Sequence, residues 1–219
     1  MLPFPFAVQH EFGCDLLPVT APKKGAAVPE PPASHRLPFL GGMDGFVRFA
    51  DVRAGWCDEG FAFSVRFDGK AAAKPFEPNV GEPDEADGVT LWLDARPSGR
   101  SRRAGRYCRQ FWFCPVSNAK GDRVHVEELP IDQRTESVQA VDPLPKAKIK
   151  RTKTATVLTA FVPAGSFAGF HPGEIDRLGV FYLVRFRDDV QTPSLSEEVP
   201  VDRDPSLWLR ATLAGGSRE

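Results

Sequence analysis

The sequence predicts an all-β protein: a two-sheet antiparallel β-sandwich with a jelly-roll-like arrangement. The chain holds 21 prolines and 19 glycines among 219 residues. Most segments free of both residues are therefore eight or nine residues long, which suits strands better than helices. The longer free segments are rich in Val, Thr and Phe, the residues that favour strands.

The first three predicted strands are residues 46–54, 60–68 and 89–94. The second has strict period-two alternation, with Phe or Val at 61, 63, 65 and 67 and smaller or polar residues between them. The third alternates in the same way, since Val, Leu and Leu share one face while Thr, Trp and Asp share the other. Both patterns are typical of strands with one face in a core.

The second half of the chain continues the pattern. Strands are predicted within residues 106–114, 122–129, 131–142, 146–162, 180–192 and 208–213. The segments 154–162 and 178–187 are apolar enough to be well buried, and residues 163–167 (PAGSF) are the one place where a helical turn is expected. Many strands with turn signals between them favour a sandwich or jelly roll.

A single domain is expected over residues 1–219, because no repeat and no clear linker divides the chain. Residues 18–38 are rich in proline and are predicted to form an extended N-terminal arm that wraps the domain. Residues 76–87 are predicted to form an acidic loop.

Five short motifs then appear in a recognisable order. They are AGW (residues 54–56), an acidic turn with GFAF (58–63), DGVTLWLD (87–94), TAFVP (159–163) and DPSLW (204–208). By their order, the chain resembles the family 9 carbohydrate-binding modules and related DOMON-like sandwiches from residue 54 to residue 213. The resemblance implies a two-sheet antiparallel sandwich, often with bound calcium, that binds sugars or polysaccharide ends through paired tryptophans.

The charge is balanced, with 28 basic and 29 acidic residues and a formal net charge of −1. Nucleic acid is therefore not an expected ligand. No run approaches the roughly 18 apolar residues of a membrane span, so no membrane partner is expected. The first residues lack the basic and apolar regions of a secretion signal, and a cytoplasmic location is the default expectation.

Aromatic rings stack on the apolar faces of sugars, so tryptophans are the first candidate ligand residues. Trp92 shares its strand face with Thr90 and Asp94, which predicts a half-polar groove surface. Trp56 and Trp112 are further candidates, whereas Trp208 is expected in the core. The alternative for each of them is structural packing.

An arginine cluster lies between two predicted strands. Its members are Arg96, Arg100, Arg102, Arg103, Arg106 and Arg109. Guanidinium groups bind phosphate, sulfate or carboxylate through paired hydrogen bonds. Arg96 and Arg106 flank the loop and are predicted ligand contacts together with Asp94. The alternative is a solvated loop balanced by the acids of residues 76–87.

Metal and catalytic signatures are sparse. Calcium is a candidate cofactor through acidic turns such as Asp58 with Glu59 or Asp188 with Asp189, although solvated hairpin turns also explain these pairs. The four cysteines include no CxxC pair and are expected as reduced thiols. Acyl, phosphoryl and hydride-transfer motifs are absent. A glycosidase remains open only because paired carboxylates need not be adjacent in sequence.

Two functions are therefore predicted. The first is a noncatalytic carbohydrate-binding sandwich in which an exposed tryptophan stacks on a sugar or polysaccharide while Asp and Arg side chains bind its hydroxyls. The second is a structural or protein-interaction sandwich with buried tryptophans and no sugar ligand, whose partner is another protein.

Overall fold

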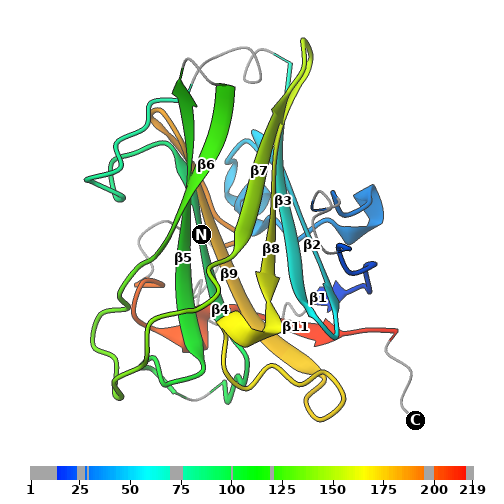
Figure 1. The fold of residues 1–219 in the computed structure, drawn as a ribbon, viewed down its shortest axis with the longest axis vertical. Coiled ribbons are helices and arrows are strands. Elements are labelled where there is room, and N and C mark those ends of the chain that lie inside the picture. Colours follow the sequence, from blue (N-terminus) through cyan, green and yellow to red (C-terminus); the bar gives the residue numbers. More distant parts are fainter. Residues whose placement is uncertain are drawn as a thin grey trace.

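Two β-sheets pack face to face in the computed structural model (Figure 1). The structure describes residues 14–23, 28, 30–69, 76–99, 101–118, 121–194 and 200–215. The larger sheet contains β1 (Cys14–Leu16), β4 (Gly88–Asp94), β5 (Cys108–Asn118), β6 (Gly121–Glu128), β9 (Arg177–Phe186), β10 (Asp189–Gln191) and β11 (Leu209–Leu213). The smaller sheet contains β2 (Ala50–Cys57), β3 (Gly60–Asp68), β7 (Lys146–Arg151) and β8 (Ala155–Pro163). The predicted fold class is confirmed.

The strand order is β1-β11-β9-β4-β5-β6 in the larger sheet, with β10 beside β9, and β2-β3-β8-β7 in the smaller one. The pairs are antiparallel except β1 with β11, which run parallel. Strands β6 and β7, one from each sheet, lie against each other along one side of the sandwich. Strands β9, β4 and β5 therefore occupy the middle of the larger sheet, where neighbours support them on both sides.

The alternation seen in the sequence sets the core. Phe63 on β3 and Leu91 on β4 are fully buried in the cluster between the two sheets, as is Val180 on β9. Residues one position away on β4 and β5 face the opposite side of the larger sheet and form two smaller buried clusters there. We refer to that side as the outer face.

The described part of residues 18–38 runs along the free edge of β2. Val19 N donates to Trp56 O at 2.8 Å, and Leu37 N donates to Val52 O at 2.9 Å. The short 3-10 helix η1 (Ala33–His35) lies between these contacts. The segment thus satisfies backbone groups that β2 would otherwise expose at a sheet edge.

Several strand boundaries follow the prediction closely. Strand β3 spans the predicted residues, and β8, β9 and β11 begin or end within one residue of theirs. The 3-10 helix η3 (Ala164–Ser166) occupies the predicted helical turn. The segment 46–54 forms a strand only from Ala50, and Phe46 and Val47 are exposed.

The strand predicted at residues 131–142 is wrong. This segment consists of turns and irregular structure. Only its first residue, Ile131, is fully buried, because its apolar residues do not alternate and so offer no strand face to a core. Arg134 in this segment instead binds another loop, since its Nη1 donates to Gly105 O and Cys108 O at 3.1 and 3.0 Å.

The cysteines are free thiols, as expected. Cys108 and Cys114 are buried in separate clusters on the outer face of the larger sheet. Burial raises the pKa of Cys108 to about 12 and that of Cys114 to about 11.

Candidate functional site

A groove lies on the outer face of the larger sheet, over β9, β4 and β5. The antiparallel register places Thr90 between Leu183 and Trp112, and Trp92 between Phe181 and Gln110. Strand alternation turns all of these side chains to the same face. The groove therefore depends on the consecutive strands β4 and β5 and on β9, which is far from them in the sequence.

Two loops wall the groove, whose cavity volume is about 130 Å³. Its lining residues are Pro83, Asp84 and Ala86 from one loop, Val201 and Asp202 from the other, and Gly88, Thr90, Trp92, Gln110, Trp112, Leu183 and Arg185 from the sheet. The lining thus mixes apolar surface with hydroxyl, amide, guanidinium and carboxylate groups.

The loop that contains Asp84 is anchored to the sheet by Asp87, which is 2% exposed. Its carboxylate accepts a hydrogen bond from Glu77 N at 2.7 Å and another from Arg187 N. Arg187 Nη1 also forms an ion pair with Glu77 Oε1 at 2.6 Å. These contacts anchor the loop that forms one wall of the groove to the sheet.

Trp92 is buried but carries an unsatisfied donor. Its ring packs edge-on against Phe181, with centroids 5.8 Å apart. Its indole Nε1 is covered and finds no hydrogen-bond acceptor within the described part of the chain. A buried N–H without a partner costs about 1–3 kcal/mol, which marks this position as one where an acceptor would stabilise the protein.

Trp112 lies across Gly88 on the neighbouring strand. A Cβ at position 88 would approach Trp112 Nε1 to 2.9 Å and Phe113 O to 2.8 Å. Only glycine leaves room for the indole there. The Trp112 ring is also packed edge-on against His125, 5.9 Å away, and is 1% exposed.

Asp94 lies on the same strand face as Trp92 but does not line the groove. It is 8% exposed, and its Oδ1 accepts from Arg96 N at 2.9 Å. Burial raises the pKa of Asp94, while hydrogen bonds from Arg96 N and the Cys108 thiol act in the opposite direction. The Asp94 carboxylate therefore binds the backbone just past the end of its own strand, β4.

Arg96 and Arg106 are brought together by Tyr107, away from the groove. Their guanidinium carbons lie over the Tyr107 ring, 5.4 and 4.8 Å from its centroid. Arg106 Nη2 also donates to Tyr107 Oη at 2.7 Å, and Arg96 Nη2 lies 3.4 Å from Glu174 Oε2. The two arginines therefore share one surface, distinct from the one that holds Trp92.

Trp56 belongs to the core between the sheets. Its Nε1 donates to Leu16 O at 2.8 Å, so its polar group is satisfied. Exposure of the ring is 6% for Trp56 and 2% for Trp208. The prediction of an exposed tryptophan is wrong for Trp56, Trp92 and Trp112, because loops and the second sheet cover the strand faces that carry them, whereas Trp208 is buried as expected.

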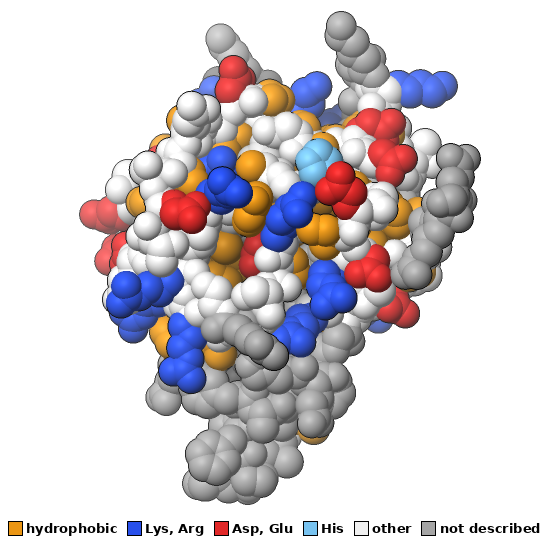
Figure 2. All heavy atoms as spheres, turned by 90° about the horizontal axis from the view of Figure 1, so that it is seen from below, with side chains coloured by type: hydrophobic (Ala, Val, Ile, Leu, Met, Phe, Trp, Pro, Cys, Tyr) orange, Lys and Arg blue, Asp and Glu red, His pale blue; other side chains and the backbone are white. Residues whose placement is uncertain are grey.

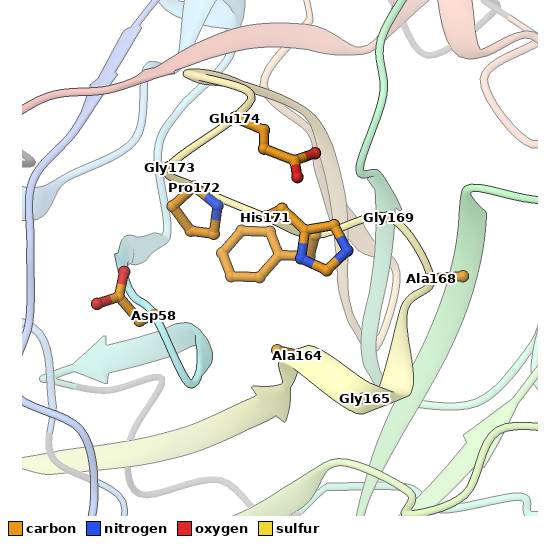
Figure 3. A pocket seen from close by; sticks show the side chains of 10 residues that line it. Asp58, Ala164, Gly165, Ala168, Gly169, His171, Pro172, Gly173 and Glu174 are labelled. Atoms are coloured by element: carbon orange, nitrogen blue, oxygen red, sulfur yellow. The ribbon is translucent and has the colours of Figure 1, made fainter. Parts of the chain in front are cut away.

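Larger hollows lie at the end of the sandwich that carries loop 164–176. One, of about 560 Å³, is lined by this loop and by Asp58; a second, of about 1130 Å³, shares Asp58 and Glu174 with it. Figure 3 shows Asp58 at one side of the first hollow, with His171 and Glu174 projecting from the loop. Figure 2 views this end and shows acidic, basic and apolar side chains interspersed, without one dominant charge.

The described residues contain no group of three or more His, Cys, Asp or Glu side chains arranged to hold a metal ion. Within the same ranges, no helix combines the length and apolar character that crossing a membrane requires. Calcium binding by the acidic turns, Asp58 with Glu59 and Asp188 with Asp189, stays a prediction.

The sequence identified Trp92 and Trp112 but not the polar partners that line the groove with them. Gln110 shares a strand face with Trp112, and Arg185 shares one with Leu183, so alternation alone could have indicated them. The contribution of Asp202 depends on a loop that returns over the sheet. No local sequence pattern predicts that this loop packs over the sheet.

Comparison with known proteins gives a similarity in fold. No family model matches the sequence, and no curated protein matches it. The structure is similar to a carbohydrate binding module family 9 from Caldicellulosiruptor kristjanssonii in complex with glucose, with 14% identity, a TM-score of 0.52, and coverage of 84% of this chain and 85% of that one. A structure of such a module from the same organism in complex with cellotriose gives 13% identity, a TM-score of 0.56, and coverage of 94% and 95%. The chain thus has a fold like that of the family 9 modules.

Proposed function

We propose that this protein is a noncatalytic carbohydrate-binding β-sandwich whose sugar site is the groove on the outer face of the larger sheet. The observation that carries the proposal is that Trp92 lines the groove and that its buried indole N–H has no acceptor within the described residues. The neighbours of similar fold were solved with glucose and cellotriose, which supports the choice of ligand class. A sugar hydroxyl would supply the missing acceptor.

The lining suits a neutral sugar. Hydroxyl groups both donate and accept, so they can bind the Arg185 guanidinium, the Gln110 amide and the Asp202 carboxylate in one orientation. Leu183 and Val201 offer apolar surface to the C–H groups of the ring. Because the groove is small and walled on two sides, we infer that it takes a single sugar unit at the end of a chain.

The tryptophans would then act by their edges and polar groups rather than by open stacking. Trp92 Nε1 is covered, so side-chain movement in the groove would accompany binding. Trp92 and Trp112 are the two predicted ligand residues that line the groove. Sugar contacts from Asp94, Arg96, Arg106 and Trp56 stay predictions, since these residues do not line it.

A second candidate function follows from a separate observation. All four tryptophans are at least nine-tenths buried, as expected for a structural or protein-interaction sandwich that binds no sugar. The two functions differ in one outcome, which is whether the folded protein binds any saccharide.

The test is calorimetric titration of the full chain with neutral mono- and oligosaccharides, including glucose and cellotriose, followed in parallel by tryptophan fluorescence. Arg185→Ala and Asp202→Ala change groove residues that are not fully buried, so both variants should stay folded. Trp92→Ala is less suitable, because truncating a buried tryptophan costs about 3–5 kcal/mol.

We expect saturable binding by the wild type and at least about tenfold weaker binding by each groove variant, the loss expected for one good hydrogen bond to a charged group. Lys148→Ala and Asp189→Ala remove exposed charges outside the groove and should bind like the wild type. A folded wild type that binds none of the sugars would reject the carbohydrate function and leave the protein-interaction alternative. Release of reducing sugar from a bound oligosaccharide would contradict the noncatalytic assignment.

A further inference from the structure

A second surface of the molecule carries several arginines. It lies where β4 ends and β5 begins, at the lower end of the larger sheet in Figure 1. We call it the arginine platform, and it consists of Arg96, Arg102, Arg103, Arg106 and Arg210. Arg210 joins the others from β11, since its Nη2 donates to Gly99 O at 3.3 Å. Arg100 belongs to the same connection but lies outside the described residues.

Hydrogen bonds from Arg134 and Thr135 fix the backbone of the loop that carries the platform. Ala104 is fully buried, and its carbonyl accepts from Thr135 N at 3.0 Å and from Thr135 Oγ1 at 3.2 Å. Arg134 binds the carbonyls on either side of the next turn. Ser101 Oγ closes the loop by donating to Arg103 O at 2.7 Å. The exposed guanidinium groups therefore project from a fixed backbone, which reduces the entropy lost on binding.

Tyr107 orders two of the guanidinium groups further. Both Arg96 and Arg106 lie over its ring, and Arg106 is also hydrogen-bonded to its hydroxyl. The ring is itself supported by the backbone of Gly169, which has a φ of +86° and where a Cβ would approach Tyr107 Cδ1 to 2.7 Å. A guanidinium stacked on an aromatic ring keeps its N–H edge free for an acceptor.

The platform carries more positive than negative charge, although Glu136 acts on Arg106 and Glu174 pairs with Arg96. Among the described residues, Arg96 is its one member in an ion pair, with the largely exposed Glu174. The acidic loop at residues 76–87 does not balance it, because that loop precedes the start of β4 whereas the platform follows the end of β4. The protein as a whole has a net charge of −1, so this excess is local.

We propose that the arginine platform binds the carboxylate or sulfate groups of an acidic polysaccharide. Guanidinium groups form paired hydrogen bonds with both anions, and several of them along one surface match the repeated charge of such a chain. Nucleic acid fits less well, because residues 95–106 contain no aromatic side chain and the Tyr107 ring is covered by two arginines, which removes the stacking that single strands need. The proposal is independent of the groove and its neutral sugar.

The test compares two triple variants with the same change in charge. Arg102→Gln/Arg103→Gln/Arg106→Gln removes three charges from the platform. Lys146→Gln/Lys148→Gln/Lys150→Gln removes three exposed charges from the edge strand β7. Binding to polygalacturonate, dextran sulfate and neutral dextran is measured at two salt concentrations, and circular dichroism checks that each variant is folded.

We expect the wild type to bind one or both acidic polymers, with affinity that falls as salt is raised, and not to bind neutral dextran. The affinity of the arginine variant for the acidic polymers should fall about tenfold or more, and that of the lysine variant less than about twofold. Polygalacturonate and dextran sulfate distinguish carboxylate from sulfate as the preferred group.

Three results would overturn the proposal: no binding of either acidic polymer, equal losses in both triple variants, or tighter binding of a single-stranded oligonucleotide than of either polymer. The groove variants Arg185→Ala and Asp202→Ala should retain acidic-polymer binding, whereas the arginine variant should retain any neutral-sugar binding. Failure of the platform and failure of the groove are thereby separate outcomes.

Discussion

Gln191 joins the two sheets through one buried side chain, and its replacement should be costly. The residue ends β10 in the larger sheet and is 2% exposed. Its Oε1 accepts from Phe49 N and Ala50 N, both at 2.9 Å, and its Nε2 donates to Ala50 O at 2.9 Å. The start of β2 thus receives from Gln191 the hydrogen bonds that a neighbouring strand would otherwise supply.

Gln191→Leu keeps the volume of the side chain but leaves two donors and one acceptor without partners. Each buried, unpaired group costs about 1–3 kcal/mol, and since Phe49 is only half-buried the lower end applies, for a total of about 3 kcal/mol. For a chain of this size that loss lowers the melting temperature by about 6–12 °C.

Thermal unfolding and urea unfolding, both followed by near-ultraviolet circular dichroism, measure the effect. Gln139→Leu provides the matched control, because the Gln139 side chain is exposed and its replacement should change stability by less than about 0.5 kcal/mol. If Gln191→Leu destabilises the protein no more than this control does, the side chain is not what closes the edge of β2.

Two further predictions concern buried polar groups. Burial raises the pKa of Asp94, so this residue contributes stability at low pH that is lost as pH rises from about 4 through the higher folded value. The melting temperature of Asp94→Asn, relative to that of the wild type, should therefore rise between pH 4 and pH 7. A difference between the two that does not change with pH would contradict this. The buried Ser64 hydroxyl has no partner within the described residues, so Ser64→Ala should be neutral or stabilising by up to about 1 kcal/mol in urea unfolding. A loss of more than about 1 kcal/mol would show that the hydroxyl is paired.

Strand alternation was the most informative signal in the sequence. It predicted the bounds of β3 and the inner face of β4, because a period of two along a strand is a purely local property. It failed at residues 131–142, where a polar segment without alternation was assigned to a strand on its length and composition alone. Strand β1 lies in the larger sheet through its parallel pairing with β11, a contact between opposite ends of the chain that no local pattern reveals.

The arginine cluster illustrates the same division. Its density was visible in the sequence, but the expected neutralisation by residues 76–87 depends on where two loops lie in space. The structure places those acids before the start of β4, pairs Glu77 with Arg187, and adds Arg210, which is far away in the sequence. The acids nearest to the cluster are instead Glu136 and Glu174, which come from other parts of the chain.

By itself the sequence determined the all-β class, the two-sheet architecture and which residues share each strand face, because glycine, proline and side-chain alternation act over a few neighbouring residues. Only the tertiary structure decided what covers each face. Trp92 was correctly placed beside Thr90, yet the loops that contribute Ala104, Ile131 and Val201 close over its ring. Covering a face is a long-range event, set by how loops pack once the sheet has formed, and it turned an expected exposed tryptophan into a buried one beside a narrow groove.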